Sequence, residues 1–87
     1  MSLKSPCKLL YQIVHATKYA KDATTAQRTW RADGLLRGIG QYLSDNSAEY
    51  MLKYPEYVGE ISKALRQARK RVFSHERRIR AQERVGQ

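Results

Sequence analysis

The sequence has few of the residues from which catalytic, metal and disulfide sites are built. Cys7 is the only cysteine, so no disulfide can close within the chain, and a disulfide-stapled secreted domain is excluded. The two histidines, His15 and His75, are far from Cys7 and from each other, and no two of the three have metal-ligand spacing. The eight acidic residues are isolated, which leaves no carboxylate pair for acid–base catalysis. We therefore expect no enzyme activity, no metal site and no cofactor.

A phosphate-binding loop and a membrane span are also missing. The glycines at 34, 38 and 40 are followed by no Lys-Ser/Thr pair and preceded by no strand pattern, so they do not match a phosphate loop. The longest apolar run, Leu9–Val14, is interrupted by Gln12 and is far shorter than the roughly 18 residues that a membrane span needs. An integral membrane protein is therefore not expected.

The compartment is predicted from the thiol and from the first 21 residues. A single cysteine fits a reducing, intracellular compartment, either the cytoplasm or a nucleoid. The first 21 residues contain four lysines and no acid, a charge pattern also found in organellar transit peptides, so the mitochondrial matrix is the alternative. The apolar residues of this segment fit a helix of the fold, and we assign the segment to the domain.

The 87 residues are enough for one small domain, 1–87, with one thin core. No stretch shows the apolar–polar alternation of a strand, so the sequence predicts an all-α bundle of three or four helices. The first helix is expected at about 6–21, with Ser5 as its N-cap and Pro6 at its first position. Its buried face is predicted to include Leu10, Ile13, Val14, Thr17 and Ala20.

A second helix is expected from Thr24, where Thr24 and Gln27 fit a capping box, to about Leu43, with Trp30 in the core. Asp33-Gly34 in its middle either interrupts this helix or is tolerated within it, which decides between four and three helices. If the helix continues, Gly34 and Gly38 form a smooth patch that another helix could approach closely.

Short-range signals place the remaining helices. Ser47 can begin a short helix that runs through Leu52, and Tyr54-Pro55 ends it because a residue before proline is disfavoured in the α region. Pro55 then opens a long helix to about Arg84. Its apolar seam is predicted at Val58, Ile61, Leu65, Ala68, Val72 and Ile79. The seam weakens towards the end, so residues about 74–87 are expected to project as a helix end or tail.

Positive charge is the strongest functional signal. The chain carries 17 Lys and Arg against eight Asp and Glu, a formal charge of +9, and more than half of these cations fall in the long helix. Such basicity is most typical of nucleic-acid binding, although an inert basic surface remains open. We expect a non-catalytic module, within a larger complex, that binds RNA or DNA through phosphate contacts of this helix. The predicted contact residues are Lys63, Arg66, Arg69, Lys70, Arg71, Arg77 and Arg78.

Tyrosines cluster in the same part of the chain, at positions 42, 50, 54 and 57. Aromatic rings can stack on bases in single-strand binders, but at helix ends a tyrosine more often buries its ring and leaves its hydroxyl wet. Packing is therefore the favoured interpretation. No helix-turn-helix is predicted, because proline stands where its tight turn is expected and cations surround the long helix.

A second hypothesis is a structural or adaptor subunit of a protein assembly. The long helix would then dock on a protein partner, with Phe73 and Ile79 as interface anchors. Self-association into a homo-oligomer is possible in either case. Peripheral attachment to anionic lipid is a weaker third hypothesis, because the apolar face narrows after Val72.

The segment Leu10-Tyr11-Gln12, near the start of a short and very basic helical chain, resembles the mitochondrial LYR family. Proteins of that family are small adaptors for iron–sulfur and respiratory-complex assembly, and some bind an acyl carrier protein. The match covers Leu10-Tyr11 with overall size and charge. Gln12 stands where the family has a basic residue, and Ile39 or Tyr42 would have to replace the family's phenylalanine. The resemblance implies an adaptor function in mitochondria, and it carries no functional residue over to this chain.

Overall fold

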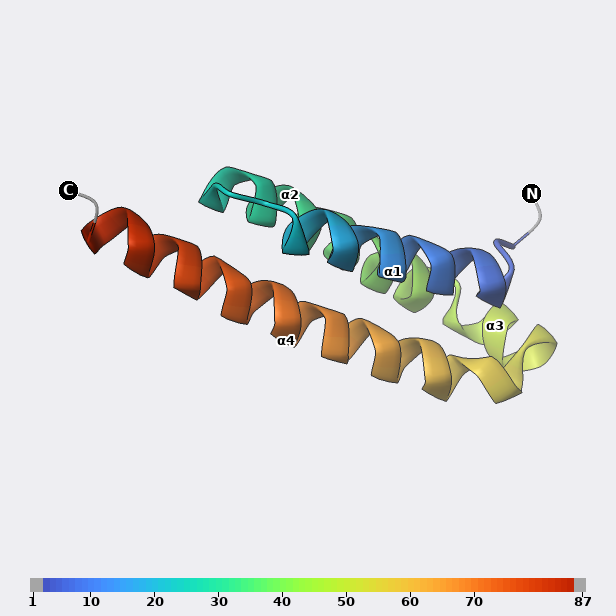
Figure 1. Cartoon of the computed structure of the whole chain (residues 1–87). Coiled ribbons are helices and arrows are strands. Elements are labelled where there is room, and N and C mark those ends of the chain that lie inside the picture. Colours follow the sequence, from blue (N-terminus) through green and yellow to red (C-terminus); the bar gives the residue numbers. More distant parts are fainter. Residues whose placement is uncertain (1–2, 86–87) are drawn as a thin grey trace.

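The structure, a computed structural model that describes residues 3–85, consists of four helices (Figure 1). They are α1 (Pro6–Lys21), α2 (Ala26–Asp45), α3 (Ser47–Lys53) and α4 (Pro55–Val85). Between residues 3 and 85 there is no strand. The all-α prediction is confirmed, as is the long final helix. Residues 3–85 form four helices because α3 is a separate short helix, and not because α2 is interrupted at Asp33-Gly34.

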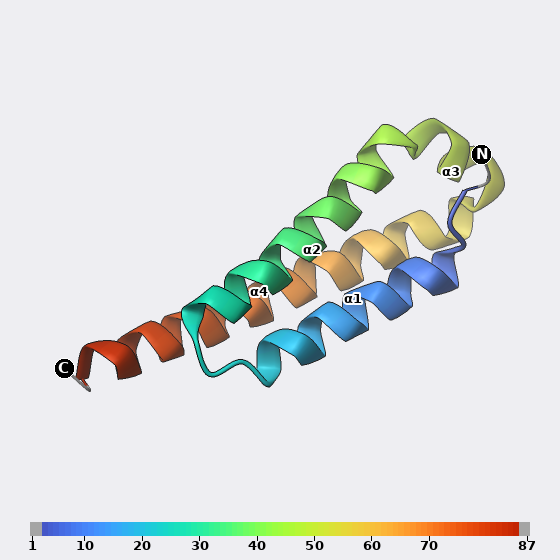
Figure 2. The same ribbon diagram turned by 90° about the horizontal axis from the view of Figure 1, so that it is seen from above.

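The three longer helices lie side by side along one axis. In Figures 1 and 2, α1 and α2 run antiparallel, and α4 packs along both of them in the direction of α1. The short α3 turns the chain at one end, next to the start of α1, while the last turns of α4 reach the opposite end. The molecule is consequently elongated, with extents of 53 × 22 × 18 Å.

Local signals in the sequence explain most helix ends. Ser5 caps α1 as predicted, because its Oγ accepts a hydrogen bond from the Lys8 backbone N–H at 3.2 Å. Tyr54 lies outside the α region, at φ −133° and ψ 53°, and separates α3 from α4. The predicted capping box at Thr24 is wrong. Helix α2 begins one residue later, with Thr25 as its N-cap, and the Thr25 side chain makes no capping hydrogen bond.

Helix α2 continues through Asp33-Gly34 without a break. Ala32 and Leu36, on either side of this pair, are both fully buried, so tertiary packing holds the helix across its weakest point. The Asp33 carboxylate adds an ion pair to Arg37 one turn later, at 2.9 Å. Packing on both sides therefore outweighs the low helix propensity of Gly34.

The core lies where α1, α2 and α4 meet. The buried residues of α4 follow the predicted seam, with Val58 and Leu65 partly buried at its margin. Buried alanines on all three helices let the backbones approach closely. The cluster comprises Leu9, Ile13, Ala16, Ala20, Ala32, Leu36, Ile39, Leu43, Tyr50, Ile61, Ala68 and Val72.

The face of α1 is rotated from the prediction. Leu9 and Ala16 are buried, whereas Val14 is 66 % exposed. Helix α1 contacts both α2 and α4, and the face that packs between them carries Leu9, Ile13, Ala16 and Ala20. The spacing of the apolar residues correctly predicted a helix but not which face of α1 is buried.

The packed part of α4 extends beyond residue 74. Ile79 is only 5 % exposed, and the His75 ring Nε2 lies 3.1 Å from the Ala23 carbonyl oxygen, in the link between α1 and α2. The residues from 80 to 85 are helical and exposed. The final part of the expected tail, residues 86–87, lies outside the described residues.

Candidate nucleic-acid interface

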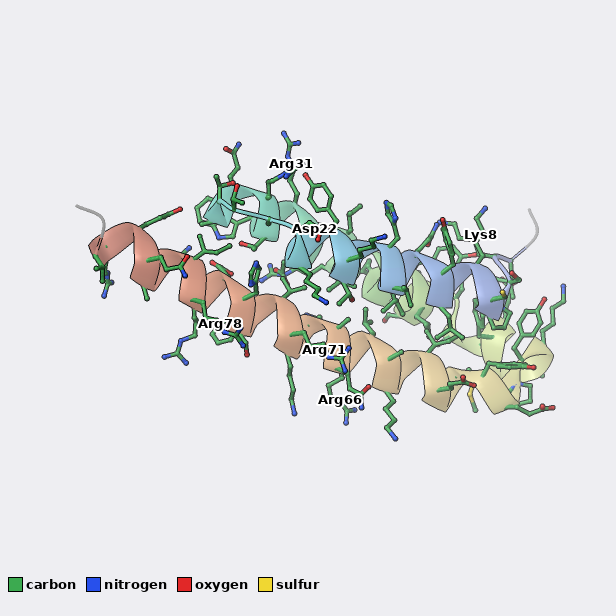
Figure 3. All side chains as sticks on the ribbon, viewed as in Figure 1. Lys8, Asp22, Arg31, Arg66, Arg71 and Arg78 are labelled. Carbon is green, nitrogen blue, oxygen red and sulfur yellow. The ribbon has the colours of Figure 1, made fainter. Side chains whose placement is uncertain are left out.

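Helix α4 carries most of the positive charge and presents it on three sides. It holds nine of the 17 Lys and Arg and only four acidic residues. Figure 3 shows Arg66, Arg71 and Arg78 along α4, on the side of the molecule opposite Lys8 and Arg31. All seven predicted contact residues are exposed. They do not form one surface, because the three consecutive cations 69–71 are directed to three sides of the helix.

The solvent-facing side of α4 carries a row of cations, which we call the α4 ridge. Its members are spaced by three, four or seven residues, as one side of a helix requires, with Phe73 between Lys70 and Arg77. The α4 ridge comprises Lys63, Arg66, Lys70, Arg77 and Arg84. Within residues 3–85 none of them forms an ion pair.

The side of α4 towards α1 forms a second basic surface, the α1–α4 groove. Arg71 and Arg78 line it from α4, and Lys21 lines it from the end of α1. Lys18 lies further along the same junction, beside Arg71, with Asp22 as the acidic residue there. Neither lysine is among the contact residues predicted from the sequence. Their place beside α4 depends on how α1 packs, which no local pattern reveals.

The side of α4 towards α2 is less positive, because acids pair with its cations. Asp33 accepts from Arg37 at 2.9 Å and lies 3.9 Å from Arg69. Glu76 pairs with Arg80 at 2.9 Å, one helical turn apart on α4. Arg69 thus differs from the other six predicted residues, since an acid of α2 already neutralises part of its charge.

The prediction that Trp30 belongs to the core is wrong. Its side chain is 54 % exposed at the start of α2. The indole Nε1 donates a hydrogen bond to Glu76 Oε1 at 2.7 Å, and the Arg80 guanidinium lies 5.3 Å from the ring centroid. In this part of α2 the fully buried residues are Thr29 and Ala32 instead of the tryptophan. The ring is held at the surface by polar partners on α4.

The two predicted interface anchors have different environments. Phe73 is 59 % exposed, so it is accessible to a partner. Ile79 is buried in this chain and supports the packing of α4 instead. Of the two predicted anchors, therefore, Phe73 is the one that presents an apolar surface to a partner.

The clustered tyrosines form a row of ring contacts at the α3 end of the molecule. Tyr42, Tyr50 and Tyr54 are in edge or tilted contact, and Tyr57 follows as the outermost ring. Tyr50 is fully buried, and its hydroxyl donates to the Lys4 carbonyl oxygen. Burial raises the pKa of Tyr50 above the ordinary value of 10.0. These contacts favour packing for this row, with Tyr57 as its most exposed member.

A separate aromatic–basic contact joins α1 to α2. The Arg28 guanidinium lies 5.2 Å from the centroid of the Tyr19 ring. Hydrogen bonds from Arg28 and then from Arg31 lower the pKa of the Tyr19 hydroxyl below 10.0. This contact lies away from the α4 ridge, and it binds two of the chain's cations to the body of the bundle.

Among residues 3–85, no three His, Cys, Asp and Glu side chains come together in a way that could hold a metal ion. None of the helices in this range combines the length and apolarity of a membrane crossing.

Comparisons with protein-family models, with curated proteins and with solved structures found no significant match. In the segment that resembles the LYR family, Leu10 is partly buried and Tyr11 is 70 % exposed.

Proposed function

We propose that this chain is a non-catalytic module that binds nucleic acid through phosphate contacts of α4, as part of a larger complex. One observation carries the proposal. Seven of the nine cations of α4 are exposed and form no ion pair within residues 3–85. They are Lys63, Arg66, Lys70, Arg71, Arg77, Arg78 and Arg84.

The arrangement of these cations suits a polyanion. The α4 ridge and the α1–α4 groove are adjacent, because Lys70 and Arg71 are consecutive and also border the same surface. A chain of phosphates following α4 would meet cations over several helical turns. Such contacts depend on salt through counterion release, and they carry no sequence preference by themselves.

The first test is a titration of the protein with labelled single- and double-stranded RNA and DNA at about 50 and 200 mM salt. With about four phosphate contacts, affinity should fall roughly a hundredfold between the two salt concentrations. Absence of binding to all four nucleic acids at the lower salt would contradict the proposal.

The interface is tested by a pair of matched double variants. Arg66→Gln with Arg77→Gln removes two charges from the α4 ridge, and Lys8→Gln with Arg31→Gln removes two charges from the opposite side of the bundle. The ridge variant should weaken binding to all sequences and reduce the salt slope by about two units. The matched variant should change the slope much less. Equal losses in both would mean that net charge acts alone, without an interface on α4.

Exposed apolar residues support the second candidate, an adaptor subunit that docks on a protein. Met51 and Leu52 are neighbouring exposed residues of α3, apart from the charge of α4. An adaptor with this surface should self-associate in isolation, and Leu52→Ser should suppress that association. Sedimentation of the wild type and the variant tests this candidate, because a nucleic-acid module should be a monomer or a defined dimer that Leu52→Ser does not change.

A further inference from the structure

Two exposed aromatic rings line one groove between α2 and α4. Trp30 projects from α2 and Phe73 from α4, and the partly buried Leu65 lies at the same surface. Both rings are more than half exposed. We call this surface the α2–α4 groove. Aromatic side chains of this size are normally buried for their hydrophobic stabilisation, so two at one surface are a feature to be explained.

Each ring is positioned by polar contacts rather than by burial. Trp30 is held by its hydrogen bond to Glu76 and by the guanidinium of Arg80. The Arg77 guanidinium lies 5.9 Å from the centroid of Phe73. Both residues remain more than half exposed beside these arginines, and such ring–arginine combinations are used to stack nucleobases.

The charges of the groove favour an anionic occupant. Its lining includes two acids, Asp33 and Glu76, and both already pair with arginines. The cations of the lining outnumber these acids. They are Arg37, Arg66, Arg69 and Lys70. Arg37 and Arg69 already pair with Asp33, so the uncompensated positive charge of the groove comes from Arg66 and Lys70. A ligand with flat apolar groups joined by negative charges fits this combination.

We propose that the α2–α4 groove binds unpaired bases of single-stranded nucleic acid, with Phe73 and Trp30 as stacking platforms. The proposal rests on the proposed function, and it names the class of nucleic acid. Lys70 and Arg77 lie three and four residues from Phe73 on α4, so they can reach the phosphates on either side of a base stacked on that ring. In a duplex the bases are stacked on each other and their faces cannot reach these rings.

The test combines affinity with the fluorescence of Trp30, which is the only tryptophan. The probes are single-stranded RNA, single-stranded DNA and a DNA duplex of matched charge. Phe73→Leu should weaken binding of the single strands about tenfold, as loss of one stacked base requires, and leave duplex binding unchanged. Single strands should quench Trp30, whereas the duplex should not. The RNA and DNA arms show whether the groove prefers one of the two.

Tyr11→Leu is the matched control, because it removes a ring of comparable exposure from α1, 70 % for Tyr11 against 59 % for Phe73. It should leave the affinity for single strands unchanged. Binding that is unaffected by Phe73→Leu, or equal quenching of Trp30 by duplex and single strands, would overturn the inference while the proposed function stands. Absence of binding to every nucleic acid would overturn both. Polyglutamate that quenches Trp30 and competes as well as the single strands would assign the groove to an acidic protein instead.

Discussion

Tyr50 joins parts of the chain that are far apart in sequence. Its buried ring contacts Tyr42 of α2 and Tyr54 after α3, and its hydroxyl donates to the carbonyl of Lys4 ahead of α1. The Lys4 backbone N–H in turn donates to the Tyr42 hydroxyl at 2.9 Å. One residue thus fixes the segment before α1 against the turn between α2 and α4.

The Tyr50→Phe variant should lose about 1 kcal/mol of unfolding free energy at pH 8, because the Lys4 carbonyl loses its donor. Since the folded pKa of Tyr50 is raised, the unfolded chain ionises first as pH passes 10.0. The stability that Tyr50 contributes is therefore present below pH 10.0 and is lost above it. Urea unfolding at pH 8 and 11 should show the difference between wild type and variant shrinking at the higher pH. If wild type and variant lost the same unfolding free energy between pH 8 and 11, their difference would not shrink and the prediction would be contradicted. Tyr11→Phe, which changes an exposed ring, serves as the control.

At the level of single residues, spacing identified the seam of α4 but misplaced Trp30 and Val14. Whether an apolar residue next to a buried face lies in the core or at the surface depends on how the neighbouring helices pack. For Trp30 the deciding partners are Glu76 and Arg80, which are 46 and 50 positions away. The position of Lys18 and Lys21 at the basic surface beside α4 likewise depends on how α1 packs. No short-range pattern contains that information.

At the level of helices, α2 has more glycine than its packing requires. Apart from the adjacent residues and backbone of α2 itself, no heavy atom of the described chain lies within 4 Å of a Cβ built on Gly34 or Gly38, so the smooth patch they form serves no contact between these helices. A Cβ on Gly40 would lie 3.3 Å from Leu65 Cδ2 of α4.

Alanine should therefore act differently at these positions. Gly34→Ala and Gly38→Ala should each stabilise the fold by about 0.5–1 kcal/mol, because alanine loses less backbone entropy in a helix. Gly40→Ala should gain less, since Leu65 has to move. Midpoints of urea unfolding measure all three. A loss of stability at Gly34 or Gly38 would show that the exposed face of α2 is occupied, for instance by a second copy.

The helix boundaries were predictable where the sequence contains strong local signals. Ser5-Pro6 and Tyr54-Pro55 fixed the beginning of α1 and the junction of α3 and α4. The continuity of α2 was not predictable, because it depends on burial of Ala32 and Leu36 against other helices. The same limit applies to the site: the basic residues of α4 were found from composition, whereas their division among three sides required the packing.

At the level of the whole molecule, self-repulsion opposes folding. The chain has a formal charge of +9, and neighbouring cations on α4 are three or four residues apart. Several like-charged pairs at this spacing, at a few tenths of a kcal/mol each, cost on the order of 1 kcal/mol.

Added salt should consequently raise the melting temperature, whereas it weakens nucleic-acid binding. If salt screens about 1 kcal/mol of repulsion between the cations, the melting temperature should rise by about 4–8 °C for a domain of this size. Thermal unfolding at about 20 and 500 mM sodium chloride measures it. The double variant of Arg66 and Arg77 should gain less from salt than wild type. An equal gain would point to a general salt effect on the core.

The elongated shape separates the two ends of the described chain. The segment before α1 lies at the α3 end of the molecule, whereas α4 ends with Arg84 and Val85 at the opposite end of the elongated shape (Figure 2). An affinity tag or a surface attachment placed before Leu3 leaves the outer turns of α4 open to solution. The same attachment after Val85 would crowd the final cations and mask them from a long polyanion. The direction in which the protein is immobilised therefore affects how many of the cations of α4 a long polyanion can reach.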